Sequence, residues 1–276
     1  RNLITGQQLL RAVKPEAELI IDGQKYNVGG LYGQEEHAYL LPEWIGNFTS
    51  GENDFQFISY FESELKPYVN WKQAFWAGNV KNPTGKVLTL HFKSARLEGI
   101  AVAVHYEIYD GLPLIVKWLS LTNNTAESVK INRVISEKLA FVEEESAVVG
   151  SPEEMKKQHG IYLETNYVIN NAMGHGISDQ IIRWKTDSVY TSQVNYSFQT
   201  PCLLEVYPEK VTAVTLHPGE EFRSVRTHEL LMDSYDRERR GLAVRKMYRT
   251  VAPWTAQNPI FMHLESKNDD EVKNAI

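Results

Sequence analysis

The strongest constraint on the fold is a repeated one-by-one alternation of apolar and polar residues, with short turns between the alternating runs. Residues 100–109 show it most cleanly, because every second residue is Ile, Val or Tyr. A period of two indicates a β-strand with one buried face. The pair Asp22-Gly23, between residues 18–21 and 24–28, favours the two-residue turn of a β-hairpin. Further strands are expected over residues 86–97, 114–121, 129–141, 181–185, 189–200, 203–207, 211–216 and 222–232.

Many strands joined by short turns, with almost no helix between them, predict an all-β fold of antiparallel sheets stacked as a sandwich. The period changes after residue 234. Asp236 is a suitable N-cap for a helix over residues 237–250, and Pro253 ends it. Residues 259–264 form a short apolar run typical of a buried parallel strand. A second helix is expected to begin at residues 268–271, which are mostly acidic and suit the positive N-terminal end of a helix. We therefore expect a sandwich domain at 1–234, a linker helix and junction at 235–258, and the start of a truncated β/α domain at 259–276.

Charge and composition exclude several partner classes. The 276 residues carry a formal net charge of −6, and no basic run extends beyond Arg237–Arg240, so nucleic acid is not an expected partner. No apolar stretch approaches the length that spans a bilayer, so no membrane partner is expected. Cys202 is the single cysteine, which rules out an internal disulfide. The first residue is Arg1, as after removal of a signal peptide, which favours a periplasmic or secreted location over a cytoplasmic one.

Residues 41–79 are the best candidate for a carbohydrate-binding region. The segment is rich in aromatic residues, alternates poorly and contains several polar residues, as binding loops on a rigid sheet scaffold do. Sugar rings stack their apolar face on flat aromatic side chains, while amides and carboxylates bind the hydroxyls. The alternative is that the tryptophans plug the sandwich or a domain interface. The predicted carbohydrate-binding residues are Trp44, Asn53, Asp54, Trp71 and Trp76.

Other candidate sites have weaker support. His175 lies between two glycines and, with Glu205, could act as an acid/base pair on a sugar, although a plain loop histidine is the simpler interpretation. Residues 143–145 are three glutamates, which we expect to form a solvated acidic edge. Trp118 and Trp184 are expected within strands. The histidine spacing shows no metal-binding motif, so neither a metal nor another cofactor is expected.

Two stretches carry a resemblance to a known family. Residues 233–254 read DSYDRERRGLAVRKMYRTVAPW and are followed by QNPI at 257–260; residues 105–118 read HYEIYDGLPLIVKW and lead into LTNN at 121–124. The first resembles the junction between the N-terminal β-supersandwich and the catalytic (β/α)8 barrel of α-galactosidase-like glycosidases of family thirty-six. The second is similar to a strand–turn–strand in the same N-terminal domain.

The resemblance implies a galactose-mutarotase-like β-supersandwich with two large antiparallel sheets. It also implies a parent enzyme that hydrolyses α-galactosides or related α-glycosides with retention, using two barrel carboxylates beyond residue 276. We therefore expect a non-catalytic domain that shapes substrate access and subunit contacts. The partners that follow from this are an α-galactoside or related oligosaccharide, its own missing barrel and further copies of itself in a homo-oligomer. The alternatives are a free-standing mutarotase-like sugar enzyme and a plain carbohydrate-binding module.

Overall fold

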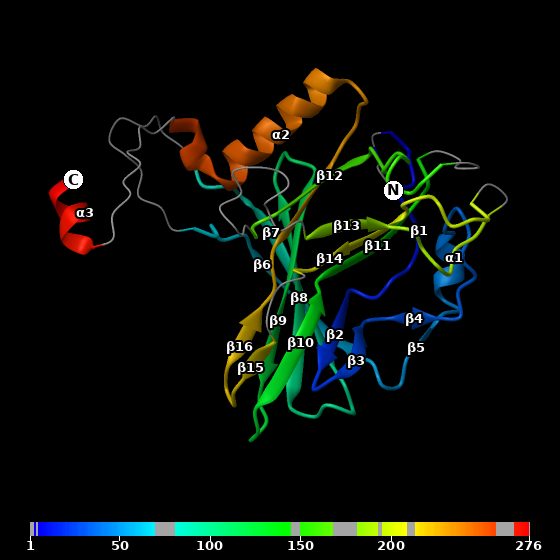
Figure 1. The fold of residues 1–276 in the computed structure, drawn as a ribbon, viewed down its shortest axis with the longest axis horizontal. Coiled ribbons are helices and arrows are strands. Elements are labelled where there is room, and N and C mark those ends of the chain that lie inside the picture. The colour runs from blue at the N-terminus through cyan, green and yellow to red at the C-terminus, as the bar shows by residue number, and fades with distance from the viewer. Residues whose placement is uncertain are drawn as a thin grey trace.

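The computed structural model describes residues 3, 5–69, 81–144, 150–167, 181–192, 195–208, 213–257 and 268–275. Within these residues the chain is built of antiparallel β-sheets, with a helix laid across one end of them (Figure 1). The expected all-β class is therefore confirmed. No helix in the described part of the chain is long and apolar enough to cross a membrane.

One layer is a seven-stranded sheet. Its strand order is β12-β17-β9-β8-β7-β6, and the short strand β16 also pairs with β9. Its strands are β6 (Gln56–Glu64), β7 (Gly85–Lys93), β8 (Ile100–Tyr109), β9 (Leu114–Asn123), β12 (Ile161–Thr165), β16 (Glu221–Arg223) and β17 (Thr227–Leu231).

The facing layer consists of two four-stranded sheets, ordered β15-β10-β2-β3 and β1-β11-β14-β13. The expected strand over 129–141 is broken at Ser136, whose backbone N–H and hydroxyl both donate to the carbonyl of Val206. This break sends the chain from one small sheet into the other. Their strands are β1 (Leu10–Ala12), β2 (Ala17–Ile21), β3 (Gln24–Val28), β10 (Val129–Ile135), β11 (Glu137–Phe141), β13 (Ile182–Lys185), β14 (Leu203–Val206) and β15 (Val214–Leu216).

The core between the layers is made by the alternation that the sequence shows. Every second residue of β8, from Ile100 to Val104, is buried against β2, β3 and β10. The β2–β3 hairpin has the expected turn, because Asp22 and Gly23 both have positive φ (48° and 76°). A small hairpin of β4 (Leu31–Tyr32) and β5 (Thr49–Ser50) lies beside this layer.

Two expected strands are wrong. In the described part of 189–200 there is no strand, because the Asn195 side chain accepts hydrogen bonds from the backbone N–H groups of Gln199 and Thr200 and closes a loop. The expected strand over 222–232 is split into β16 and β17, and residues 224–226 between them are not part of a strand. Residues 86–97 also leave the strand after Lys93.

The helices follow the predicted pattern. Helix α2 (Arg237–Val251) begins at Asp236, whose side chain accepts from the N–H of Arg239 at 2.8 Å, and it buries Met247 against the outer face of the seven-stranded sheet. A short 3₁₀ helix (Pro253–Gln257) follows. The remaining helices are α1 (Pro42–Ile45) and α3 (Asp269–Ala275). The predicted strand over 259–264 lies outside the described residues.

The sandwich interior also contains charge. Lys117 of β9 is buried and donates to Glu137 of β11 at 2.8 Å and to the carbonyl of Glu16 at 2.8 Å. Its ammonium lies 3.0 Å from the Glu16 carboxylate. Glu229 of β17 is buried beside them and hydrogen-bonds to Glu137. We call these four residues the interior cluster.

Candidate carbohydrate-binding loop

Three of the predicted binding residues lie between β4 and β6, in residues 33–55, a stretch that contains only the short elements α1 and β5. Trp44 lies in the short helix α1 and is half-buried, while Asn53 and Asp54 lie in the turn before β6. Trp71 and Trp76 lie outside the described residues. The assignment of carbohydrate binding to these five residues therefore stays a prediction.

Trp44 belongs to a cluster of three rings. The rings of His37 and Tyr39 are nearly parallel, with their centroids 5.7 Å apart. The centroid of the Trp44 ring lies 5.2 Å from that of His37 and 5.5 Å from that of Tyr39. Tyr39 is 48% exposed, so the cluster reaches solvent. The sequence analysis missed His37 and Tyr39. They precede residues 41–79, and a wider aromatic count around Trp44 would have included them.

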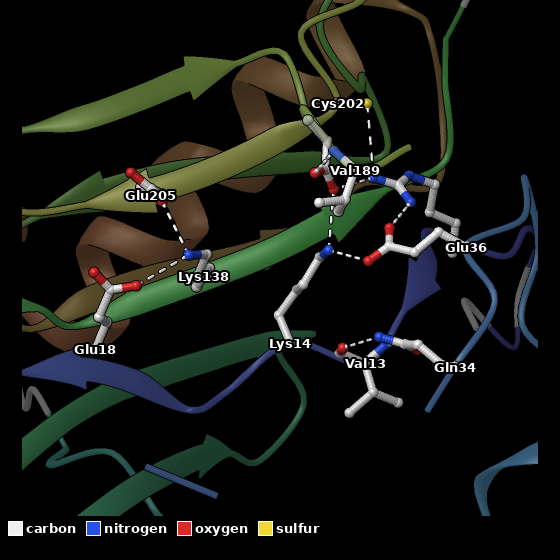
Figure 2. A network of polar contacts seen from close by, with 11 residues as sticks. Val13, Lys14, Glu18, Gln34, Glu36, Lys138, Val189, Cys202 and Glu205 are labelled. Atoms are coloured by element: carbon white, nitrogen blue, oxygen red, sulfur yellow. Dashed lines mark hydrogen bonds and ion pairs between the residues drawn. The ribbon is translucent and has the colours of Figure 1, made fainter. Parts of the chain in front are cut away.

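The loop that carries these rings is clamped at its start. Gln34 makes a two-way contact with the backbone of Val13: its side-chain oxygen accepts from the Val13 N–H at 3.0 Å, and its amide donates to the Val13 carbonyl at 2.5 Å (Figure 2). Further along, Gln8 donates to the carbonyl of Leu40 at 3.0 Å. Both ends of the segment before α1 are therefore tied to the N-terminal strand region.

A buried ion network lies beneath the same loop. Glu36 contacts Lys14 (Figure 2) and accepts from Arg11 at 2.5 Å. Asp187 also accepts from Arg11 and lies 3.1 Å from Lys14. The guanidinium of Arg11 also lies 3.8 Å above the ring of Tyr190. We call Arg11, Lys14, Glu36 and Asp187 the loop-base cluster. Two cations and two carboxylates are balanced there, which lets the protein bury them together.

The electrostatics of the loop-base cluster follow from this balance. Burial disfavours the charged form of Asp187, but attraction to Lys14 and hydrogen bonding from it outweigh burial, so the pKa of Asp187 lies below its ordinary value. Asp187 also accepts from the N–H of Val189 at 3.2 Å. Burial raises the pKa of the nearby Cys202 thiol, which keeps it protonated and inert.

Asp54 has a structural position in this region. Its carboxylate accepts from the N–H of Asn27 at 3.0 Å and from the hydroxyl of Tyr32 at 2.5 Å, and the side chain is buried. A Cβ at Gly51 would lie 2.6 Å from the Asp54 carboxylate, so only glycine fits there. Asp54 thus holds the β4–β5 hairpin, while the exposed Asn53 side chain remains accessible to a ligand.

Two of the grooves on the sandwich lie away from this loop and are large enough to be considered as active sites. A cavity of about 520 Å³ between β10 and β16 is lined by Arg133, Arg223 and uncharged residues, both polar and apolar, without an Asp or Glu among its described lining. A cavity of about 240 Å³ runs along α2 and includes Trp254. Two glutamates line this smaller cavity, and both are paired, Glu107 with Arg226 and Glu164 with Tyr248. Neither groove therefore presents a free pair of carboxylates.

The other sequence candidates are placed as follows. Trp118 and Trp184 lie in β9 and β13, as expected. Glu205 is buried and paired with Lys185 at 2.7 Å and Lys138 at 3.3 Å, while its suggested partner His175 lies outside the described residues.

The expected solvated acidic edge at 143–145 is wrong for Glu144. Its half-buried carboxylate contacts Nδ1 of the His159 imidazole, and the hydroxyl of Tyr235 donates to it at 3.3 Å. The imidazole of His159 stacks on the ring of Tyr235, with centroids 3.5 Å apart. Side chains from other segments thus cover Glu144, whereas the run of three glutamates in the sequence predicted that it would be solvated. Within the described ranges, no group of three His, Cys, Asp or Glu residues could hold a metal ion.

Comparisons with known proteins give matches only among solved structures. No protein-family model matches the chain, and no curated protein matches it. The GH36 alpha-galactosidase AgaA from Geobacillus stearothermophilus, solved with raffinose, is 14% identical with a TM-score of 0.46; the match covers 88% of this chain and 34% of that one. AgaB from the same organism is 14% identical with a TM-score of 0.42, covering 82% and 32%. An alpha-galactosidase from Lactobacillus brevis is 13% identical with a TM-score of 0.45, covering 90% and 33%.

These enzymes belong to the family that the sequence resembles. The chain spans about a third of their length. At such identities and TM-scores the likeness assigns no activity, and the function proposed for this chain therefore rests on its own residues.

Proposed function

We propose that the chain is a non-catalytic sandwich domain of an α-galactosidase-like glycoside hydrolase, and that it contacts carbohydrate through the ring cluster of His37, Tyr39 and Trp44. The domain limits at residues 234 and 258 belong to the same proposal. The observation that carries it is a solvent-reaching aromatic cluster on a loop that is anchored from below.

The anchoring matters because a sugar-binding loop must be ordered before the ligand arrives. Each side chain that becomes ordered on binding costs about 0.5–1.5 kcal/mol. Here Gln34 and Glu36 already tie the loop to Val13 and Arg11. The rings supply a flat surface for the apolar face of a pyranose, and the exposed Asn53 amide, nine residues after Trp44 in the chain, offers hydrogen bonds to hydroxyls.

A non-catalytic role is supported by the state of the carboxylates. Glycoside hydrolysis needs two carboxyl groups that face one bound sugar. The larger groove has none in its described lining, and Glu107 and Glu164 in the smaller groove are occupied by other side chains. A mutarotase role for Glu205 is disfavoured for the same reason, since Lys138 and Lys185 both pair with it.

The test is a titration of the chain with raffinose and stachyose, the sugars named with two of the solved enzymes. We expect weak binding, detected by NMR or calorimetry, that Trp44→Ala weakens at least about tenfold, equivalent to about 1.4 kcal/mol. Tyr196→Ala is the matched control, because Tyr196 is 60% exposed but lies in another loop. Trp71→Ala and Trp76→Ala examine the rest of the predicted site.

Two results would contradict the proposal. Equal affinity of wild type and the Trp44→Ala variant would remove the ring cluster from the site. Turnover of an aryl α-galactoside by the chain, abolished by a substitution within it, would show that the domain is catalytic. Binding that depends on Trp44 but shows no preference between α-galactosides and other sugars would favour a plain carbohydrate-binding module.

A further inference from the structure

Strand β6 forms one edge of the seven-stranded sheet and is exposed along almost its whole length. Eight of its nine residues are exposed. In the described structure β7 is the only strand that pairs with it. Four large apolar side chains lie on this edge, each 53–64% exposed: Phe57, Ile58, Tyr60 and Phe61.

The backbone of β6 has hydrogen-bonding groups that point away from the sheet. The N–H of Leu65 donates to the carbonyl of Gly85 at 3.0 Å, and residues 59–64 continue in register with β7. In an antiparallel pair, such bonded positions alternate with positions whose N–H and C=O point to the other side. Counting back from Leu65, the backbone groups of Glu64, Glu62 and Tyr60 face the open edge.

Soluble proteins usually protect a long edge with lysine, proline, a covering loop or a bulge. β6 contains neither lysine nor proline. Its one irregularity is the shift in register between Phe57 and Ser59, which leaves Ile58 as the extra residue of a bulge. The bulge interrupts only the start of the strand. Residues 59–64 remain a regular edge, on which the exposed Tyr60 and Phe61 are followed by two glutamates. It is a surface suited to pairing with a strand that places no carboxylate opposite these glutamates.

We propose that the occupant of this edge is β6 of a second copy, paired antiparallel about a two-fold axis at Phe61. In this register Phe61 lies opposite Phe61 of the second copy, in a non-hydrogen-bonded pair where side chains are close. Tyr60 lies opposite Glu62 of the second copy, and both are positions whose backbone groups face the open edge. Ser59 lies opposite Ser63 of the second copy.

Charge selects this register over the neighbouring ones. Like charges directly opposite each other destabilise a strand pair. An axis at Glu62 would place two Glu62 carboxylates opposite each other, and an in-register parallel pair would place both Glu62 and Glu64 beside their copies. An axis at Tyr60 would use the bulged Ile58 in the ladder. The Phe61 axis places no glutamate directly opposite another, and its pairs over residues 59–63 all lie within the regular part of the strand.

Such a pair would be isologous, with the same surface used by both copies, and would continue one sheet across the two molecules. It is independent of the proposed carbohydrate role. Trp44→Ala should leave self-association intact, and Phe61→Lys should leave sugar binding intact. The two proposals can therefore fail separately.

Cysteine cross-linking tests the register. Opposed residues in a non-hydrogen-bonded pair have Cα atoms about 4.5 Å apart, within the range of a disulfide. We expect Phe61→Cys to form a disulfide-linked dimer under mild oxidation. Ser59→Cys mixed with Ser63→Cys should also cross-link. Ser63→Cys alone should not, because its copies would lie roughly 13 Å apart along the strand. Cys202 gives no background, since it is 2% exposed.

Sedimentation of the whole chain tests the association itself. Wild type should pass from monomer to dimer as its concentration rises, and Phe61→Lys should raise the dimer dissociation constant at least about tenfold. Tyr196→Lys is the control for an added surface charge, and an unchanged thermal transition shows that Phe61→Lys is folded. A chain that stays monomeric at every concentration, or cross-linking by Ser63→Cys without Phe61→Cys, overturns the proposal.

Discussion

The loop-base cluster and the interior cluster are both buried, but they differ in charge balance. In the loop-base cluster, Arg11 and Lys14 face Glu36 and Asp187, so every carboxylate has two cations within reach. Attraction to Lys14 outweighs burial and lowers the pKa of Asp187. Asp187 therefore stays ionised at neutral pH.

The interior cluster has one cation for three carboxyl groups. Burial disfavours the charged form of Lys117, but Glu137 and Glu16 outweigh burial and raise its pKa, so it stays protonated. Burial also opposes ionisation of Glu16, but Lys117 lowers its pKa. Among the described residues, no cation besides Lys117 acts on Glu229. Burial and then the charge of Glu137 raise its pKa well above the ordinary value, which makes it a protonated donor to Glu137.

The comparison teaches that burial alone does not set the protonation of a carboxyl group in this sandwich. Asp187 and Glu229 are both buried, and their pKa values are displaced in opposite directions. The difference lies in the number of cations within hydrogen-bonding reach. The contributions of the two clusters to the free energy of unfolding should therefore change in opposite directions with pH. Loss of a cation should cost more in the interior cluster than in the loop-base cluster.

The largest expected effect is that of Lys117→Met. Removing the only cation of the interior cluster leaves the buried Glu137 and the half-buried Glu16 without a counter-charge. We expect a loss of about 3–5 kcal/mol in the free energy of unfolding. Lys138→Met is the control: Lys138 also bridges two carboxylates, but Glu18 and Glu205 each keep another lysine. Denaturant unfolding gives both values, and equal losses would show that charge balance is not the cause.

Arg11→Met should have a smaller effect, because Lys14 still faces both carboxylates of the loop-base cluster. We expect a loss of about 2–3 kcal/mol in the free energy of unfolding. The same substitution should weaken sugar binding, since it loosens the loop that carries Trp44. If unfolding is destabilised but sugar affinity does not change, the loop is ordered without the cluster.

The smallest effect is that of Glu229→Gln, and it depends on pH. A carboxyl whose pKa is raised on folding keeps its proton in the native state while the unfolded chain loses it, so stability falls as pH rises from the ordinary pKa of 4.5 toward the native value. Glu229→Gln removes this decline and should stabilise the chain on the order of 1 kcal/mol at pH 7.

Asp187→Asn is the counterpart of Glu229→Gln. The lowered pKa of Asp187 contributes stability above its ordinary value of 3.8, and this contribution is lost as pH falls through the native pKa. Asp187→Asn should therefore flatten the pH dependence of the free energy of unfolding below about pH 4. Glu229→Gln should flatten it above that pH. Thermal unfolding across pH 3–8 (roughly the range of these titrations) measures both, and identical profiles for the two variants would refute the comparison.

Local pattern was enough to predict most of the elements. The alternation in residues 100–109 became β8, Asp22-Gly23 became the hairpin turn, and Asp236 became the cap of α2. These depend on contacts between residues near one another in the chain. The errors arose where a side chain competes for the backbone, as Asn195 does in its loop, or where a distant carbonyl does, as that of Val206 does at Ser136.

The candidate site was only partly predictable. The sequence pointed to Trp44 and to the loop around it, because aromatic residues without alternation are visible in a single segment. The sequence analysis also assigned Asp54 to ligand binding. In the folded chain its carboxylate accepts hydrogen bonds from Asn27 and Tyr32. Whether a polar side chain faces a ligand or a neighbour depends on which segments fold beside it.

The amino-acid sequence by itself determined the β-rich class, the hairpin turn and the helix after residue 234, since each follows from the period and the caps of a continuous stretch. Only the tertiary structure decided the protonation of Glu229 and the anchoring of the loop before Trp44. The physical reason is distance along the chain. Glu229 meets Glu137, and Arg11 meets Asp187, only after strands far apart in sequence have paired, and the charges that set each pKa are brought together at that step.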